Sequence, residues 1–116
     1  MQNMEESFSR FDDKTTHRYF VITHVDPNDD VLIVNRSTYH GFPSEDTSCI
    51  LNPGDHSSVT KTSYIPYKFA KIEKYSSIPK ERLERDVSTE LYERMRAGAR
   101  MSDFIPHECY LFIMNH

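Results

Sequence analysis

An aspartate and a histidine at a tight turn are the residues of this sequence whose types and spacing most directly suggest chemistry. Residues 52–55 are Asn-Pro-Gly-Asp, a strong turn signal, and His56 follows Asp55 directly. Turns often present reactive side chains to solvent from a rigid base, and an imidazole exchanges a proton near neutral pH. Asp55 could orient that imidazole or favour its charged form. The pair predicts general acid–base chemistry, although an exposed histidine beside an ordinary turn explains the same residues at least as well.

Polar side chains suited to phosphate follow an apolar run at residues 31–34. Arg36 could stabilise phosphate charge, and Ser37 and Thr38 could donate hydrogen bonds to it. Groups at the end of a buried strand are held firmly, which favours a binding role. The alternative is that these residues form a turn and that Arg36 is an ordinary solvated charge. The sequence favours neither interpretation.

A hydroxyl-rich stretch follows the Asp-His turn. Lys61 begins it, and Ser63 could reach the same cleft and position a phosphate. Tyr64 and Tyr67 could stack on nucleic-acid bases. Tyrosines in such a pattern are more often amphipathic core residues whose hydroxyl contacts water. The stretch permits an RNA-binding surface without requiring one.

The sequence gives little support for metal or cofactor chemistry. None of the six histidines falls in an HxH or HExxH motif, and the donors at residues 107–109 would alternate between the two faces of a strand. Three glycines are too few for a glycine-rich phosphate loop. Cys49 and Cys109 form no CxxC motif and are most simply reduced thiols of a cytoplasmic protein. We therefore expect no metal and no cofactor.

Length and charge limit the remaining possibilities. The 116 residues suit one domain, which we place at residues 17–116, after a polar and flexible N-terminal arm at residues 1–16. The arm lacks the apolar core of a signal peptide, and no apolar run is long enough to span a membrane. The net charge of −4 excludes a strongly basic nucleic-acid footprint. A local basic patch could still bind RNA.

Short strands followed by a helix must position the candidate side chains. Residues 18–25 and 31–34 are rich in apolar and β-branched residues and flank a turn at residues 26–30, which predicts an antiparallel hairpin. The wholly apolar second strand should be buried on both faces. Further extended segments are expected at residues 48–51, 62–67, 68–72 and 107–114, with Pro66 interrupting the middle pair.

A capped helix is expected before the last of these strands. Residues 80–85 suit a helical turn, and Ser88 is a good N-cap for the helix that follows. Leu91, Met95 and Ala99 are spaced by four residues and therefore share one face. The order of elements predicts a mainly β, α+β fold, namely a small SH3-like barrel with a C-terminal helical segment.

The layout of the chain resembles the MazF/PemK family of small toxins. Residues 31–38 resemble the family's second strand with its terminal Thr or Ser, residues 63–72 the strand that follows, and residues 88–101 the capped C-terminal helix. The resemblance covers roughly residues 17–101 and is one of pattern more than of identity. It implies an SH3-like barrel that is usually dimeric, cleaves single-stranded RNA without a metal and is silenced by a cognate antitoxin protein.

The resemblance also implies roles for particular residues. Arg18 or Arg36 would stabilise charge with Thr38 or Ser37 as the partner, although His17-Arg18 stands where the family usually has Arg-Pro. The resulting expectation is a toxin-type endoribonuclease. Its catalytic residues would be Arg36, Thr38, Asp55, His56 and Ser63, and its RNA contacts Arg18, Lys61, Tyr64 and Tyr67.

The alternative is a non-catalytic small barrel that binds a protein partner, as an inhibitor or an adaptor. The acidic net charge is unusual for an RNA-cleaving protein, and the pairing of Asp55 with His56 is not part of the family's pattern. Convergence of the candidate catalytic side chains in one cleft would favour the enzyme, and their scatter would favour the binding module.

Overall fold

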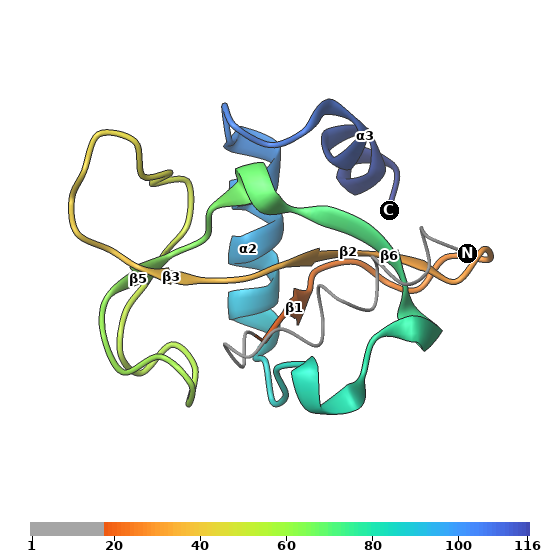
Figure 1. Cartoon of the computed structure of the whole chain (residues 1–116), viewed down its shortest axis with the longest axis horizontal. Coiled ribbons are helices and arrows are strands. Elements are labelled where there is room, and N and C mark those ends of the chain that lie inside the picture. The colour runs from red at the N-terminus through yellow and green to blue at the C-terminus, as the bar shows by residue number, and fades with distance from the viewer. Residues whose placement is uncertain (1–17) are drawn as a thin grey trace, which may run out of the picture.

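Two small antiparallel sheets and two α-helices form the part of the chain that the structure, a computed structural model, describes, which is residues 18–116 (Figure 1). The arm expected at residues 1–16 lies outside the described residues. The strands are β1 (Phe20–Val21), β2 (Asp30–Val34), β3 (Ser37–Thr38), β4 (Ile50–Leu51), β5 (Ser63–Tyr64) and β6 (Lys71–Lys74). The helices are α2 (Thr89–Met101) and α3 (His107–Asn115), and 3₁₀ turns η1, η2 and η3 lie at Tyr67–Phe69, Tyr75–Ser77 and Lys80–Arg82.

β1 and β2 form the antiparallel hairpin that the sequence predicts. Phe20 of β1 pairs with Val34 at the end of β2. β1 is much shorter than the expected strand at residues 18–25, because the main-chain hydrogen bonding between β1 and β2 is interrupted at Thr23. The Oγ1 atom of Thr23, rather than a main-chain carbonyl, accepts the N–H of Leu32 at 3.0 Å.

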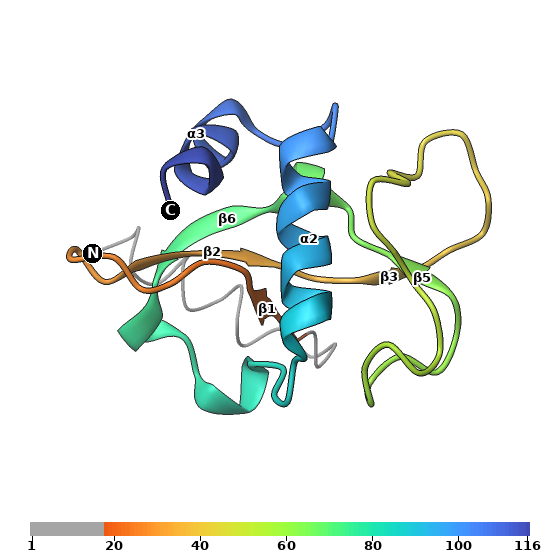
Figure 2. The same ribbon diagram turned by 180° about the vertical axis from the view of Figure 1, so that it is seen from behind.

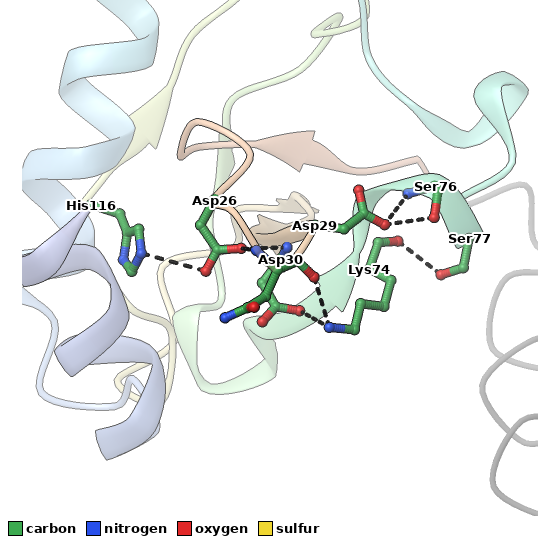
Figure 3. Close-up of polar contacts among 8 residues, drawn as sticks. Asp26, Asp29, Asp30, Lys74, Ser76, Ser77 and His116 are labelled. Atoms are coloured by element: carbon green, nitrogen blue, oxygen red, sulfur yellow. Dashed lines mark hydrogen bonds and ion pairs between the residues drawn. The ribbon is translucent and has the colours of Figure 1, made fainter.

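The turn of this hairpin is built from aspartates (Figure 3). The Oδ1 atom of Asp26 accepts the main-chain N–H groups of Asn28 at 2.9 Å and of Asp30 at 2.8 Å. Asp29 has a positive φ of 67°. Its carboxylate accepts hydrogen bonds from the hydroxyl and the main-chain N–H of Ser76, which lower the pKa of Asp29. These contacts attach the turn to the segment that follows β6.

β2 is the central strand of the first sheet, and both of its faces are buried as predicted. The strand order is β1-β2-β6, with β2 antiparallel to both neighbours. Leu32 and Val34 belong to the main core, whereas Val31 and Ile33 form a second apolar cluster with Ile78. Side chains alternate along a strand, so an uninterrupted apolar run fits a strand that is covered on both sides.

The second sheet begins close to the end of the first, because β2 leads almost directly into β3. Its strand order is β3-β5-β4, again antiparallel. Only Asn35 and Arg36 separate β2 from β3, and the two strands lie end to end in Figures 1 and 2. Among the described strands, no pairing joins the two sheets into a closed barrel. The observed fold is therefore α+β, with two three-stranded sheets.

Pro66 divides the chain where the sequence predicts an interruption. β5 ends before it, η1 follows it, and β6 then begins at Lys71. Proline has no N–H to donate to a neighbouring strand, so the ladder does not continue through it. The strand expected at residues 48–51 is present as β4, which is two residues long.

α2 begins and packs as the sequence predicts. The Ser88 hydroxyl caps it by accepting the main-chain N–H of Leu91 at 3.1 Å. Leu91, Met95 and Ala99 are all buried in the main core. The helical turn expected at residues 80–85 is the single turn η3 and ends three residues earlier than expected.

The strand expected at residues 107–114 is wrong, because this segment is α3. Its apolar residues are consecutive, so the pattern has no period of two and fits a helix as well as a strand. The carbonyl of Pro106 accepts the N–H groups of Cys109 and Tyr110, which starts the helix. Cys109 and Ile113, four residues apart, then enter the main core. Within the described chain, neither α2 nor α3 has the length and apolar character needed to cross a membrane.

Candidate functional site

A polar cleft of about 690 Å³ lies where four separate segments of the chain meet. They are the start of the described chain, the residues after β2, the turn after β4 and the segment before α2. A parallel bridge between Tyr19 and Leu83 holds the first and the last of these side by side. The residues that line the cleft are Arg18, Arg36, Ser37, Thr38, His56, Ser57, Ser58, Glu84, Arg85 and Asp86.

The cleft lining is basic although the chain as a whole is acidic. It contains three arginines against two carboxylates, those of Glu84 and Asp86, and so carries one net positive charge when His56 is neutral. The whole chain has a net charge of −4. Guanidinium groups bind phosphate and carboxylate through a planar array of donors. Arginines gathered with hydroxyls in a concave surface are the chemistry of an anion-binding site.

The guanidinium of Arg36 is anchored at one nitrogen and lacks a partner at another. Its Nη2 atom donates to the main-chain carbonyl of Ser58 at 2.6 Å. Its Nε–H is buried and has no hydrogen-bond partner among residues 18–116. Most buried polar groups in proteins are hydrogen-bonded, and an unpaired one costs free energy. This N–H is closed to solvent, so an oxygen of an anion bound in the cleft would reach it only if the Arg36 side chain shifted toward the cleft.

The imidazole of His56 is held through both ring nitrogens. Its Nε2 atom lies 2.5 Å from the carbonyl oxygen of Arg85, and its Nδ1 atom lies 2.8 Å from the Ser58 hydroxyl and 3.1 Å from the Ser58 main-chain nitrogen. A carbonyl only accepts and a main-chain N–H only donates, so Nε2 carries the proton and Nδ1 is the acceptor. The Phe20 ring packs edge-on against the imidazole, and His56 is only 7% exposed. The expectation of a solvent-exposed imidazole is therefore wrong.

Asp55 is next to His56 in sequence, but its carboxylate binds elsewhere. The Oδ2 atom accepts the main-chain N–H of Asn52 at 2.8 Å and forms an ion pair with Arg94 of α2 at 3.2 Å. The Asn52 N–H, with a contribution from the Arg94 guanidinium, lowers the pKa of Asp55. The carboxylate thus closes its own turn and attaches it to α2. The carbonyl of Arg85, rather than Asp55, orients the imidazole.

β3 supplies two of the expected hydroxyls to the cleft, and a third lies behind it. Ser37 and Thr38 line the cleft. Ser63 pairs with Thr38 across β3 and β5, but it is buried, and its hydroxyl donates to the carbonyl of Lys61 at 2.8 Å. Ser63 is therefore a neighbour of the cleft and not part of its surface. Lys61 is exposed and lies outside the lining.

The two tyrosines expected to stack on bases lie away from the cleft. Tyr67 is fully buried, and its hydroxyl donates to the Met95 carbonyl at 2.6 Å. Burial raises the pKa of this hydroxyl. Tyr64 packs edge-on against Tyr39, with ring centroids 6.2 Å apart, and burial raises its pKa as well. For Tyr67, the alternative interpretation as a core residue is the one that holds.

Five residues line the cleft to which the sequence assigned no role. Ser57 and Ser58 follow the Asp-His turn, and Glu84, Arg85 and Asp86 follow η3. The composition of residues 80–85 resembles that of a helix, which concealed the extended course of this segment. The identity of Asp86 was the one local signal in the sequence, because aspartate adopts a positive φ more readily than most residues. In the structure Asp86 has a φ of 59°.

The cysteines and histidines of the described chain do not gather into a metal site. Residues 18–116 contain no group of three or more His, Cys, Asp or Glu side chains that could hold a metal ion. Cys49 and Cys109 are free thiols, and both are buried. Burial raises the pKa of the Cys49 thiol and raises that of Cys109 to about 11. Such thiols stay protonated and unreactive at neutral pH.

Comparisons with protein-family models, with curated proteins and with solved structures found no match for this chain. The resemblance to the MazF/PemK family therefore stays a prediction. A function for the cleft has to be argued from its own geometry: a basic lining, an arginine with an unpartnered N–H, and an imidazole whose tautomer is set by its neighbours.

Proposed function

We propose that the cleft binds a phosphodiester of single-stranded RNA, and that the protein is a toxin-type endoribonuclease that cleaves this bond without a metal. The observation that carries the proposal is the state of Arg36. Its guanidinium is fixed to the Ser58 carbonyl and has a buried Nε–H with no partner among the described residues, in a cleft that Arg18 and Arg85 also line. Donors held in this way stabilise the charge that develops on a phosphorane.

Cleavage of RNA without a metal needs three chemical contributions. A base takes the proton of the 2′-hydroxyl, an acid protonates the leaving 5′-oxygen, and a cation stabilises the phosphorane. In the proposed complex Arg36 is the cation, and Thr38 donates a hydrogen bond to a non-bridging oxygen. His56, whose Nδ1 is unprotonated, is the base. Asp55 and Ser63 support the site from outside it, because their side chains are bonded to nearby main-chain groups.

The mixed charge of the lining supports a nucleotide ligand over a bare phosphate. Carboxylates accept hydrogen bonds from the amino groups on base edges. Glu84 and Asp86 flank Arg85 in the cleft, so a base and its phosphate could be held by adjacent residues. The volume of about 690 Å³ is also ordinary for a ligand site, for which roughly 300–1,000 Å³ is typical.

The proposal also covers the architecture, the location and the protein partners of the molecule. The two sheets would be the halves of a small SH3-like barrel, since the chain passes from β2 directly into β3 and from β5 through η1 into β6. The protein would act in the cytoplasm as a homodimer and be silenced by a cognate antitoxin protein. The large apolar side chains available for such contacts are Val25, Phe42, Phe69, Tyr75, Met101, Phe104, Leu111 and Met114, which are all exposed.

A non-catalytic barrel that binds a protein partner is the second candidate. The observation that favours it is the engagement of both His56 ring nitrogens within the chain, which is typical of a histidine with a structural role. In that case the arginines of the cleft would bind a carboxylate-bearing segment of the partner. Both candidates use the same anion-binding surface, so catalysis distinguishes them.

Incubation of the purified full-length protein with a long single-stranded RNA tests the enzyme. We expect discrete fragments that persist when a metal chelator is added. DNA of the same sequence should stay intact, because it lacks the 2′-hydroxyl. No cleavage across several RNAs would overturn the ribonuclease and leave the binding module, and loss of cleavage with chelator would overturn the metal-independent mechanism.

A further inference from the structure

The Ser58 hydroxyl connects the buried imidazole of His56 to the cleft. We propose that Ser58 is a catalytic residue that relays the proton of the RNA 2′-hydroxyl to His56, an inference that rests on the ribonuclease function proposed above. Neither the turn motif nor the family resemblance assigns Ser58 a role. Three observations carry the proposal: the direction of the hydrogen bonds, the burial of the ring and the position of Ser58 in the lining.

The hydrogen bonds at His56 run from Ser58 through the ring to Arg85, with Ser58 as the donor and the Arg85 carbonyl as the final acceptor. The Ser58 main-chain N–H at 3.1 Å makes Nδ1 an acceptor, so the Ser58 hydroxyl at 2.8 Å donates its proton to the same nitrogen. On the far side of the ring, Nε2–H donates to the carbonyl of Arg85. A hydroxyl, an imidazole and an orienting acceptor in this order form the arrangement that prepares a base to receive a proton.

The burial of the ring makes Ser58 the point of access. His56 is 7% exposed, and protein atoms contact both of its ring nitrogens. Ser58 is half-buried and lines the cleft. Both residues line the cleft, but the Oγ atom of Ser58 occupies Nδ1, so a hydroxyl bound in the cleft can pass its proton to this nitrogen through Ser58.

The proposed step conserves atoms and charge. The 2′-hydroxyl gives its proton to the Oγ atom of Ser58 while the hydroxyl proton of Ser58 passes to Nδ1 of His56. The 2′-oxygen forms its bond to phosphorus, and the bond from phosphorus to the 5′-oxygen breaks. The leaving 5′-oxygen takes a proton from water, and the imidazolium later returns its proton to water. While Nδ1 is protonated, the Ser58 hydroxyl accepts a hydrogen bond from it and the longer main-chain contact is lost.

Charged groups from each neighbouring segment surround this relay. Arg36 holds the Ser58 carbonyl from the side of β3, and Arg18 lines the cleft from the start of the described chain. Glu84, Arg85 and Asp86 line it from the segment before α2. The arginines favour the anionic phosphodiester, and the two carboxylates favour the transient imidazolium.

Ser58→Ala tests the relay because it removes only the Oγ atom. The main-chain N–H that contacts Nδ1 and the carbonyl that binds Arg36 are both retained, so the turn should keep its shape. Ser44→Ala is the matched control: Ser44 is an exposed serine that lies outside the lining of the cleft. Ser58→Thr restores a hydroxyl at the relay position.

The assay measures initial rates of RNA cleavage over a range of pH, with melting temperatures as a folding check. We expect Ser58→Ala to lower the rate about 10²-fold or more, the usual scale for a proton-transfer group. The pH dependence of the rate should differ between the wild type and Ser58→Ala, because the variant no longer transfers the proton through the imidazole. Ser44→Ala should stay near wild type, and Ser58→Thr should recover part of the rate.

The outcomes separate this inference from the proposed function. Cleavage by the wild type with equal rates for Ser58→Ala and Ser44→Ala would overturn the relay and leave the ribonuclease in place. A slow Ser58→Ala enzyme that keeps the wild-type pH profile would also overturn it, since the hydroxyl would then serve only to hold the structure. Absence of cleavage by the wild type would overturn both.

Discussion

The Nε2 atom of His56 lies 2.5 Å from the main-chain carbonyl oxygen of Arg85, a residue 29 positions further along the chain. This contact joins the turn after β4 to the extended segment before α2, and both segments line the cleft. It also determines which ring nitrogen carries the proton. One hydrogen bond therefore contributes to the shape of the cleft and to the chemistry available within it.

Replacement of His56 should affect both activity and stability. His56→Ala removes the proposed base and should lower RNA cleavage about 10²-fold or more. It also leaves the Arg85 carbonyl and the Ser58 hydroxyl without their partner, at a cost of about 1–3 kcal/mol in the free energy of unfolding. Cleavage assays and urea denaturation measure the two effects. His107→Ala, at an exposed histidine outside the cleft, should change neither.

Arg36 should contribute to catalysis through its guanidinium geometry and not only through its charge. Arg36→Ala should cost about 2.7–4 kcal/mol of transition-state stabilisation, as the loss of a preorganised donor does. Arg36→Lys should recover little of this, because an ammonium group cannot reproduce the planar donors. Arg100→Ala, at an exposed arginine of α2 outside the cleft, is the control. Equal kcat/KM values for the Arg36 and Arg100 variants would remove Arg36 from the site.

Gly98 should tolerate no side chain. A Cβ there would overlap the Tyr67 hydroxyl, lie 2.9 Å from the Cβ of Cys49 and lie 3.0 Å from the Ser48 carbonyl. The helix propensity of alanine offsets only about 1 kcal/mol of that strain. We expect Gly98→Ala to lower the free energy of unfolding by about 1–3 kcal/mol, measured by urea denaturation. Arg100→Ala, at an exposed position of α2, should stay within about 0.5 kcal/mol of wild type.

Asp55 should contribute stability that depends on pH. Its pKa in the folded protein is lowered from 3.8 by the Asn52 N–H and by Arg94. A lowered pKa means that the stabilisation is present above pH 3.8 and is lost as pH falls through the folded-state pKa. Asp55→Asn should therefore lower the melting temperature at neutral pH and reduce its decline in acid. Asp103→Asn, at an exposed aspartate, should leave the melting curve unchanged across the same range.

The oligomeric state tests the proposal for the whole molecule. We expect light scattering to report about twice the 13.7 kDa of one chain, because the exposed apolar side chains would be covered in a homodimer. The mass should not change between low and high salt if the contact is apolar. A mass of one chain at high micromolar concentration would contradict the dimer.

The sequence alone was sufficient for elements whose signals are local. The hairpin of β1 and β2 follows from two apolar segments around an aspartate-rich turn, and the burial of β2 follows from its uninterrupted apolar run. Ser88 marks the start of α2, because a cap needs only a hydroxyl within reach of an N–H three residues ahead. The spacing of Leu91, Met95 and Ala99 identified its buried face. Each of these features depends on residues that are close together in the chain.

Only the tertiary structure decided the features that depend on distant partners. The apolar run at residues 107–114 fits a helix or a strand, and packing against the main core made it α3. Tyr67 is an ordinary amphipathic tyrosine by sequence, and its burial follows from the approach of α2 at Gly98. His56 follows a polar turn, yet Phe20 and Arg85 enclose its ring. The sequence therefore determined which side chains the chain offers for chemistry, and long-range packing decided which of them meet, because the contacts that enclose the cleft join segments that no local pattern connects.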